Sequence, residues 1–133
     1  MKTTTLFVAA FASLIFGGAH ATAVTDLLQQ YQAQGAKQFE AQAGKTLWTR
    51  SFGVSSEGKE RRCATCHTED LRQTGKHIKT GKSIEPLAPS VNTKRLTEIA
   101  EIEKWFKRNC EWTLGRECSP QEKGDFLSYI RMQ

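Results

Sequence analysis

The stretch Cys63-Ala64-Thr65-Cys66-His67 decides how the rest of the chain is interpreted. Its spacing, C-x-x-C-H, is typical of covalent haem attachment. Two thiols three positions apart can each add to one of two vinyl groups on the same porphyrin edge. The histidine that follows can then bind the iron as its proximal ligand. The sequence therefore predicts one haem c, attached through Cys63 and Cys66 and ligated by His67.

Two other interpretations of C-x-x-C are weaker in this chain. A structural zinc site needs four ligands, and the remaining candidate ligands are not spaced for one. A thioredoxin-like redox site needs a βαβ context, which the pattern does not offer. The haem interpretation is therefore preferred.

The N-terminal 21 residues have the features of a secretory signal peptide. Lys2 supplies a positive charge, and residues 6–19 form an apolar stretch that is short for a membrane span. The triplet A-H-A at 19–21 is a cleavage site that would leave Thr22 first, and A-T-A at 21–23 is a second candidate. An uncleaved membrane anchor is the alternative. We expect a periplasmic protein, because c-type haem is attached beyond the bacterial inner membrane.

Cleavage after residue 21 would leave residues 22–133, which is 112 of the 133 residues and enough for one monohaem cytochrome c domain. The formal net charge is +5, and it falls to +4 when Lys2 is lost. A chain this small has a small core, so the haem should supply much of the apolar interior. No later segment predicts membrane insertion, and nucleic acid is not an expected partner outside the cytoplasm.

The segment before the pentad predicts one helix from Val24 to Ala43, because its apolar residues recur at spacings of three and four. Gly44 is placed to end this helix. Gly35 lies inside it, where a glycine lowers helix stability by about 1 kcal/mol relative to alanine. We therefore expect Gly35 to mark a close crossing by another helix.

Two further helices are expected after the pentad, separated from it by a polar loop over 75–92. One spans Thr97–Arg108, and its apolar stripe continues to Asn109. The last begins at the capping box S-P-Q-E at 119–122 and carries Gly124 as a close-approach point. An N-terminal helix that crosses a C-terminal helix, with the pentad soon after the first, indicates an all-α fold like that of class I cytochromes c.

The residue opposite His67 on the iron is not obvious, because no methionine precedes the last helix. Met1 lies in the signal, and Met132 is one residue from the end. His77 follows His67 by ten residues, which is short for a path around the haem edge. His77 or Met132 as a strong sixth ligand would make a low-spin electron-transfer cytochrome.

Asn109 is a third candidate for this position. It continues the apolar stripe and adjoins Cys110, which should pair with Cys118 in an oxidising compartment. Asn109 could instead be the C-terminal cap of its helix, the bridge could be a simple staple, and the iron position could be vacant. An amide oxygen is a hard, weak ligand that should favour ferric over ferrous iron. Reduction would then release it and admit a small ligand.

The chain resembles the SHP family of high-spin, oxygen-binding monohaem class I cytochromes c. The resemblance covers most of the mature chain and rests on four segments. These are C-A-T-C-H, I-E-P-L-A-P-S-V-N at 84–92, E-K-W-F-K-R-N-C-E-W-T-L-G-R-E-C at 103–118, and Q-E-K-G-D-F-L-S-Y-I near the end.

The resemblance implies that Asn109, beside the disulfide Cys110–Cys118, is the distal iron ligand. In the family this asparagine is displaced when the reduced haem binds oxygen or other small ligands, such as nitric oxide or carbon monoxide. His67 matches the proximal ligand. The resemblance also implies electron delivery by a dihaem cytochrome c, with a membrane cytochrome b as a further partner. Whether the protein is an enzyme acting on oxygen or a nitrogen oxide stays open.

Basic residues are frequent around the pentad and could steer an acidic redox partner at low salt. An ordinary solvated surface is the alternative. The local balance over 59–82 is +4, with three acidic residues opposing seven basic ones. The basic residues are Lys59, Arg61, Arg62, Arg72, Lys76, Lys79 and Lys82.

Overall fold

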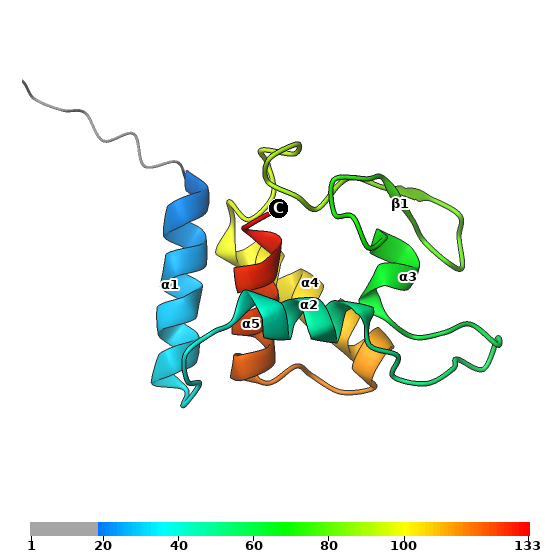
Figure 1. Cartoon of the computed structure of the whole chain (residues 1–133), viewed down its shortest axis with the longest axis horizontal. Helices are drawn as coiled ribbons and strands as arrows, with labels where there is room; N and C mark the ends of the chain where they lie inside the picture. Colours follow the sequence, from blue (N-terminus) through cyan, green and yellow to red (C-terminus); the bar gives the residue numbers. More distant parts are fainter. Residues whose placement is uncertain (1–18) are drawn as a thin grey trace, which may run out of the picture.

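The computed structural model describes residues 19–133 and shows a mostly helical chain (Figure 1). The predicted signal peptide falls largely outside the described residues. The helices are α1 (Ala19–Ala33), α2 (Ala41–Thr49), α3 (Cys63–His67), α4 (Ile99–Leu114) and α5 (Pro120–Ile130). One two-stranded sheet, β1 (Gly75–Lys76) and β2 (Ser83–Ile84), follows α3. The predicted all-α cytochrome c-like class is confirmed, with this small sheet as an addition.

Helices α2 and α5 form the most extensive contact between any two elements of the described chain. They cross in the centre of Figure 1. The backbones approach closely at Gly44, where a Cβ atom would collide with the main-chain carbonyl of Asp125 in α5. This crossing joins the segment before the pentad to the end of the chain.

The predicted helix from Val24 to Ala43 is wrong, because the chain leaves the helical conformation after α1. Gly35 adopts a φ of 97°, in the left-handed region that favours glycine. The amide of Ala36 donates to the carbonyl of Tyr31 (3.0 Å), which is the pattern of a Schellman motif. The roles expected of two glycines are therefore exchanged: Gly35 ends a helix, and Gly44 makes the close crossing.

Helix α4 is longer at its C-terminal end than the sequence predicted. It continues past Asn109 to Leu114 and ends at Gly115, whose φ of 75° is left-handed. Asn109 therefore lies inside the helix and is not its C-terminal cap. The helix continues because Cys110 and Thr113 are both buried along the face that packs inward.

The predicted start of α5 is confirmed. Ser119 accepts a hydrogen bond from the amide of Glu122 (3.2 Å), and Glu122 Oε2 accepts one from the amide of Ser119 (2.8 Å). Gly124 is also a close-approach point as expected, but its neighbour is a side chain. A Cβ there would collide with the ring of Phe39, which belongs to the segment between α1 and α2.

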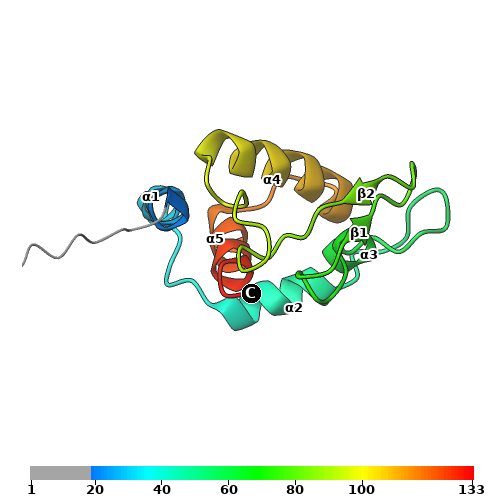
Figure 2. The same ribbon diagram turned by 90° about the horizontal axis from the view of Figure 1, so that it is seen from above.

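The buried residues form two clusters that share α5. The first contains Trp48, Phe126 and Tyr129, together with the Cys110–Cys118 pair, and joins α2 to the C-terminal part of the chain. The second joins α1 to α4 and α5; its members are Ala23, Val24, Leu27, Tyr31, Ile102 and Leu127. In Figure 2, α4 and α2 lie on opposite sides of the molecule, with α3 and the small sheet at the end away from α1.

Candidate haem site

Helix α3 consists of the five pentad residues and presents the two thiols and the imidazole together. Cys63 and Cys66 are partly buried and are not joined to each other by a disulfide. The chain turns sharply at Thr68, which has a φ of 67°. Such a conformation raises the energy of a β-branched residue by about 1–3 kcal/mol and persists only where the surroundings impose it.

Trp48 of α2 imposes this turn and positions the histidine before it. Its Nε1 donates to the carbonyl of Thr68 (2.8 Å), and its ring centroid lies 5.6 Å from that of His67. The same indole ring packs near Phe126 and Tyr129 of α5 (6.3 and 6.1 Å between centroids). The α2–α5 crossing therefore carries the residue that holds α3 in place.

The His67 imidazole is held away from water and stays neutral at physiological pH. Burial lowers its pKa to about 4, with Arg95 and His77 nearby as smaller causes. Its Nδ1 atom is buried and has no hydrogen-bond partner in the described chain. The carbonyl of Pro86 accepts hydrogen bonds from the side chains of Asn92 (3.1 Å) and Arg95 (2.9 Å).

These residues fit a covalent haem. A neutral, buried imidazole has a lone pair to offer to iron, and two unbridged thiols on one short helix suit thioether attachment. Burial raises the pKa of the Cys63 thiol to about 12, so this side chain is a neutral thiol before attachment. Within residues 19–133, no three His, Cys, Asp or Glu side chains gather as a direct metal-ion site.

Asn109 lies on the edge of the buried face of α4, with a partly exposed side chain. The side-chain amide of Asn109 has no hydrogen-bond partner among the described residues. Thr113 follows four positions later, so the two side chains lie one above the other. Thr113 is buried, as is Cys110, which directly follows Asn109. Asn109 therefore lies beside the part of α4 that packs inward.

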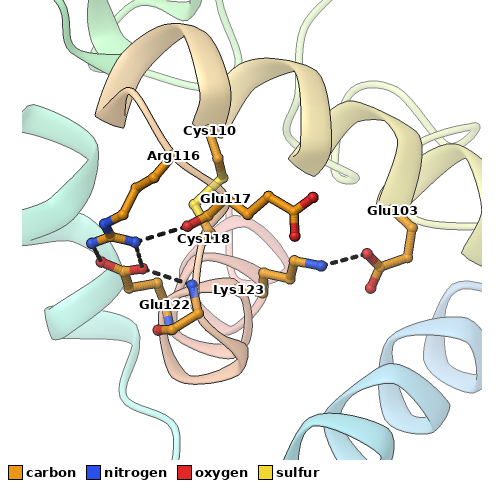
Figure 3. The surroundings of a disulfide bond; sticks show 8 residues. Glu103, Cys110, Arg116, Glu117, Cys118, Glu122 and Lys123 are labelled. Atoms are coloured by element: carbon orange, nitrogen blue, oxygen red, sulfur yellow. Dashed lines mark hydrogen bonds and ion pairs between the residues drawn. A yellow bond between two sulfur atoms is a disulfide. The ribbon is translucent and has the colours of Figure 1, made fainter.

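The structure joins Cys110 of α4 to Cys118, as the sequence predicted, with their Cα atoms 5.5 Å apart (Figure 3). Cys118 directly precedes the N-cap of α5, so the disulfide ties the end of α4 to the start of α5. The guanidinium of Arg116 forms two hydrogen bonds to Glu122 (2.8 Å each) beside it. This arrangement fixes the backbone next to Asn109.

The two other sixth-ligand candidates lie in positions that do not favour the role. His77 is exposed in the turn of the β1–β2 hairpin, and its Nδ1 accepts a hydrogen bond from the amide of Thr80 (3.2 Å). Met132 is 71% exposed after the end of α5. The geometry favours the view of His77 as a solvated loop residue.

The positive charge around the pentad is partly neutralised. Arg62 pairs with Glu60 (3.2 Å), Arg72 with Asp70 (2.9 Å), and Lys79 with Glu57 (3.2 Å). Three exposed lysines of the predicted set, Lys59, Lys76 and Lys82, form no ion pair among the described residues. Fewer unpaired positive charges therefore surround the pentad than the composition suggested.

Several residues of the site were not found from the sequence. Gly75 supports α3, because a Cβ there would collide with the carbonyl of Cys66. Thr68 forms the turn after His67, and its carbonyl accepts the hydrogen bond from Trp48. Thr113, which is buried in α4, lies beyond Arg108, where the predicted helix ended, so no helical pattern placed it on an inward face.

The fold and the pentad helix define a class of protein: a helical cytochrome c with one covalent haem c. Residues 34–130 match a family model described as "Domain of unknown function (DUF1924)". The chain is also 37% identical over 112 residues to the cytochrome c-type protein SHP of Cereibacter sphaeroides, a match that covers 84% of this chain and 85% of the relative. It belongs to the SHP family of cytochromes c.

Other comparisons agree with this assignment. Cytochrome c'' of Methylophilus methylotrophus is 49% identical over 87 residues, which is 65% of this chain and 60% of the length of that relative. The crystal structure of oxidised cytochrome c'' aligns with a TM-score of 0.72 at 38% identity, over 84% of this chain and 95% of that one. The structure of oxidised SHP, an oxygen-binding cytochrome c, aligns with a TM-score of 0.73 at 36% identity, over 83% and 96%.

Proposed function

We propose that this protein binds a small diatomic ligand at a reduced haem, and that Asn109 occupies the ligand's position in the oxidised state. The haem would be attached through Cys63 and Cys66, with His67 as proximal ligand. Held by these residues, haem c would supply an iron that exchanges one electron and binds small ligands.

One observation carries the proposal: the side-chain amide of Asn109 is partly buried on α4 beside the buried Cys110 and makes no hydrogen bond within residues 19–133. The disulfide beside it restricts the backbone, so the side chain needs only a rotation to leave its position. An amide oxygen suits ferric iron better than ferrous iron. Asn109 would therefore be released on reduction, because its hold on the metal weakens.

The family relatives support this behaviour. SHP is described as an oxygen-binding cytochrome c. A solution structure of Methylophilus methylotrophus cytochrome c'', which aligns with a TM-score of 0.71 at 37% identity, concerns the structural basis of haem-ligand detachment. Oxygen, nitric oxide and carbon monoxide are the ligands proposed here. Whether bound oxygen is carried, sensed or reduced is a question for turnover assays with the reduced protein.

Visible absorption of the holoprotein tests the proposal. The ferrous wild type should be high-spin and should shift immediately with carbon monoxide. Asn109→Ala should leave the ferric protein high-spin and speed its binding of added ligands. Glu111→Ala, at an exposed position of the same helix, is the control and should behave as wild type. A sharp low-spin ferrous spectrum that ignores carbon monoxide would favour the alternative, an electron carrier with a strong sixth ligand.

The proposed compartment is the periplasm, reached through the signal peptide predicted at residues 1–21. Among the described residues, no helix is long and apolar enough to cross a membrane. The mass of the mature protein purified from its host should correspond to a chain that begins at Thr22. A mass that retains the first 21 residues would contradict this proposal.

The proposed electron donor is a dihaem cytochrome c, with a membrane cytochrome b as a further partner. The exposed lysines Lys59, Lys76 and Lys82 would attract an acidic donor, and salt would screen this attraction. Reduction by such a donor should slow as ionic strength rises. Exchange of the three lysines for glutamine should remove most of that salt dependence.

A further inference from the structure

The turn directly after His67 is strained and is held by three hydrogen bonds. Thr68 has a φ of 67° and a ψ of 169°, a combination that is almost confined to glycine. Its amide donates to the carbonyl of Ala64 (3.0 Å), its hydroxyl donates to the carbonyl of Asp70 (2.6 Å), and its own carbonyl accepts from Trp48 Nε1 (2.8 Å). These bonds keep a β-branched residue in a conformation that it would otherwise leave.

Two further contacts confine His67 itself. The Trp48 ring lies beside the imidazole, with 5.6 Å between the ring centroids. A Cβ atom at Gly75 in β1 would lie 3.1 Å from the Cα of His67, so the strand packs directly against the histidine backbone. Trp48 is itself fixed, because it is only 4% exposed and packs near the rings of Phe126 and Tyr129 in α5. A rigid part of the fold therefore holds His67.

Such a restraint affects ligand binding on the opposite face of the porphyrin. Binding of a sixth ligand to ferrous haem draws the proximal histidine toward the porphyrin. A histidine that is prevented from following lowers the affinity for that ligand, because part of the binding free energy is used to deform the surroundings. The strain at Thr68 lies one residue from the proposed proximal ligand, where it can act in this way.

We propose that Trp48 is a positioning residue that lowers the affinity of the ferrous haem for small ligands, because its hydrogen bond to Thr68 restrains His67. This inference rests on the proposed function. It adds a control from the proximal side to the release of Asn109 on the distal side. The two controls are independent, since Trp48 belongs to α2 and Asn109 to α4.

The test uses two variants that loosen the turn in different ways. Trp48→Phe keeps an aromatic ring at the α2–α5 crossing and removes the donor to Thr68. Thr68→Gly keeps the carbonyl that accepts this bond and removes the strain, because glycine adopts a positive φ freely. In both ferrous holoproteins the iron–histidine stretching frequency in the resonance Raman spectrum should rise. Carbon monoxide should dissociate roughly 3- to 10-fold more slowly than from the wild type.

Val24→Ala is the control for a loss of stability alone. Val24 is buried in the second cluster, which joins α1 to α4 and α5. Its truncation leaves a cavity there and lowers stability, but the iron–histidine frequency and the dissociation rate of carbon monoxide should stay at their wild-type values. If Trp48→Phe does not accumulate as a holoprotein, Thr68→Gly decides the matter by itself.

Two outcomes separate this inference from the function on which it rests. An unchanged iron–histidine frequency with unchanged carbon monoxide dissociation in the variants overturns the role of Trp48 and leaves the release of Asn109 intact. A ferrous wild type that shows no iron–histidine band and takes up no carbon monoxide overturns the proposed function itself, before any variant is made.

Discussion

Gly44 of α2 lies directly against the main-chain carbonyl of Asp125 in α5. The side chain of Asp125 accepts a hydrogen bond from the amide of Glu40 at the start of α2 (2.8 Å). Asp125 of α5 therefore contacts both the beginning and the middle of α2. Because Trp48, one turn later in α2, holds the turn after His67, this crossing sets where the proposed haem ligand lies.

Gly44→Ala should destabilise the holoprotein by about 2 kcal/mol, because the added methyl group forces the two backbones apart. Guanidinium unfolding followed by haem absorption measures the loss. Lys45→Ala, at an exposed position of the same helix, should change the unfolding free energy by less than about 0.5 kcal/mol. Equal stability of both variants would contradict a close crossing at Gly44.

Loss of the disulfide should affect both stability and the proposed ligand. The double variant Cys110→Ser/Cys118→Ser should unfold at a free energy about 2.5 kcal/mol lower, because the bridge closes only a short loop. In this variant the ferric iron should also hold Asn109 less firmly, so the reduction potential of the haem should be higher. A lower stability with an unaltered potential would mean that the bridge is only a staple.

The ion pair between Arg116 and Glu122 should make stability depend on pH in the acid range. Hydrogen bonds from Arg116 lower the pKa of Glu122 below its ordinary value of 4.5. The folded state therefore favours the carboxylate, and its stabilisation is present above pH 4.5 and lost as the pH falls through the lower, folded pKa.

Glu122→Gln should flatten this part of the pH profile, because glutamine keeps the capping box but has no charge to titrate. At pH 7 the variant should be less stable by about 0.5 kcal/mol. Unfolding free energies between pH 3 and 6 measure the effect. Glu117→Gln, at a neighbouring exposed position, is the control and should follow the wild-type profile.

His77→Ala and Met132→Ala should leave the ferric and ferrous absorption spectra of the holoprotein unchanged. Both side chains are exposed, and neither belongs to α4, which carries Asn109. A change of spin state in either variant would identify a strong sixth ligand and would replace Asn109 in the proposed function.

The sequence by itself determined the features whose chemistry is local. The pentad needs only its own five residues to predict haem attachment, and the capping box needs only residues 119–122 to start α5. The pairing of Cys110 with Cys118 followed because they were the cysteines left over after haem attachment. In each case the interacting groups are close in the chain, so their spacing is itself the evidence.

Tertiary structure decided what depends on groups that are distant in the chain. Gly35 and Gly44 look alike in a periodic pattern, and only the approach of α5 shows which one ends a helix and which one permits a crossing. From the sequence, Asn109 could have been a helix cap. The structure excludes this, because the buried residues beyond it extend α4 to Leu114. The hydrogen bond from Trp48 to the carbonyl of Thr68 joins residues 20 positions apart. No local pattern records such a contact, because packing, and not propensity, creates it.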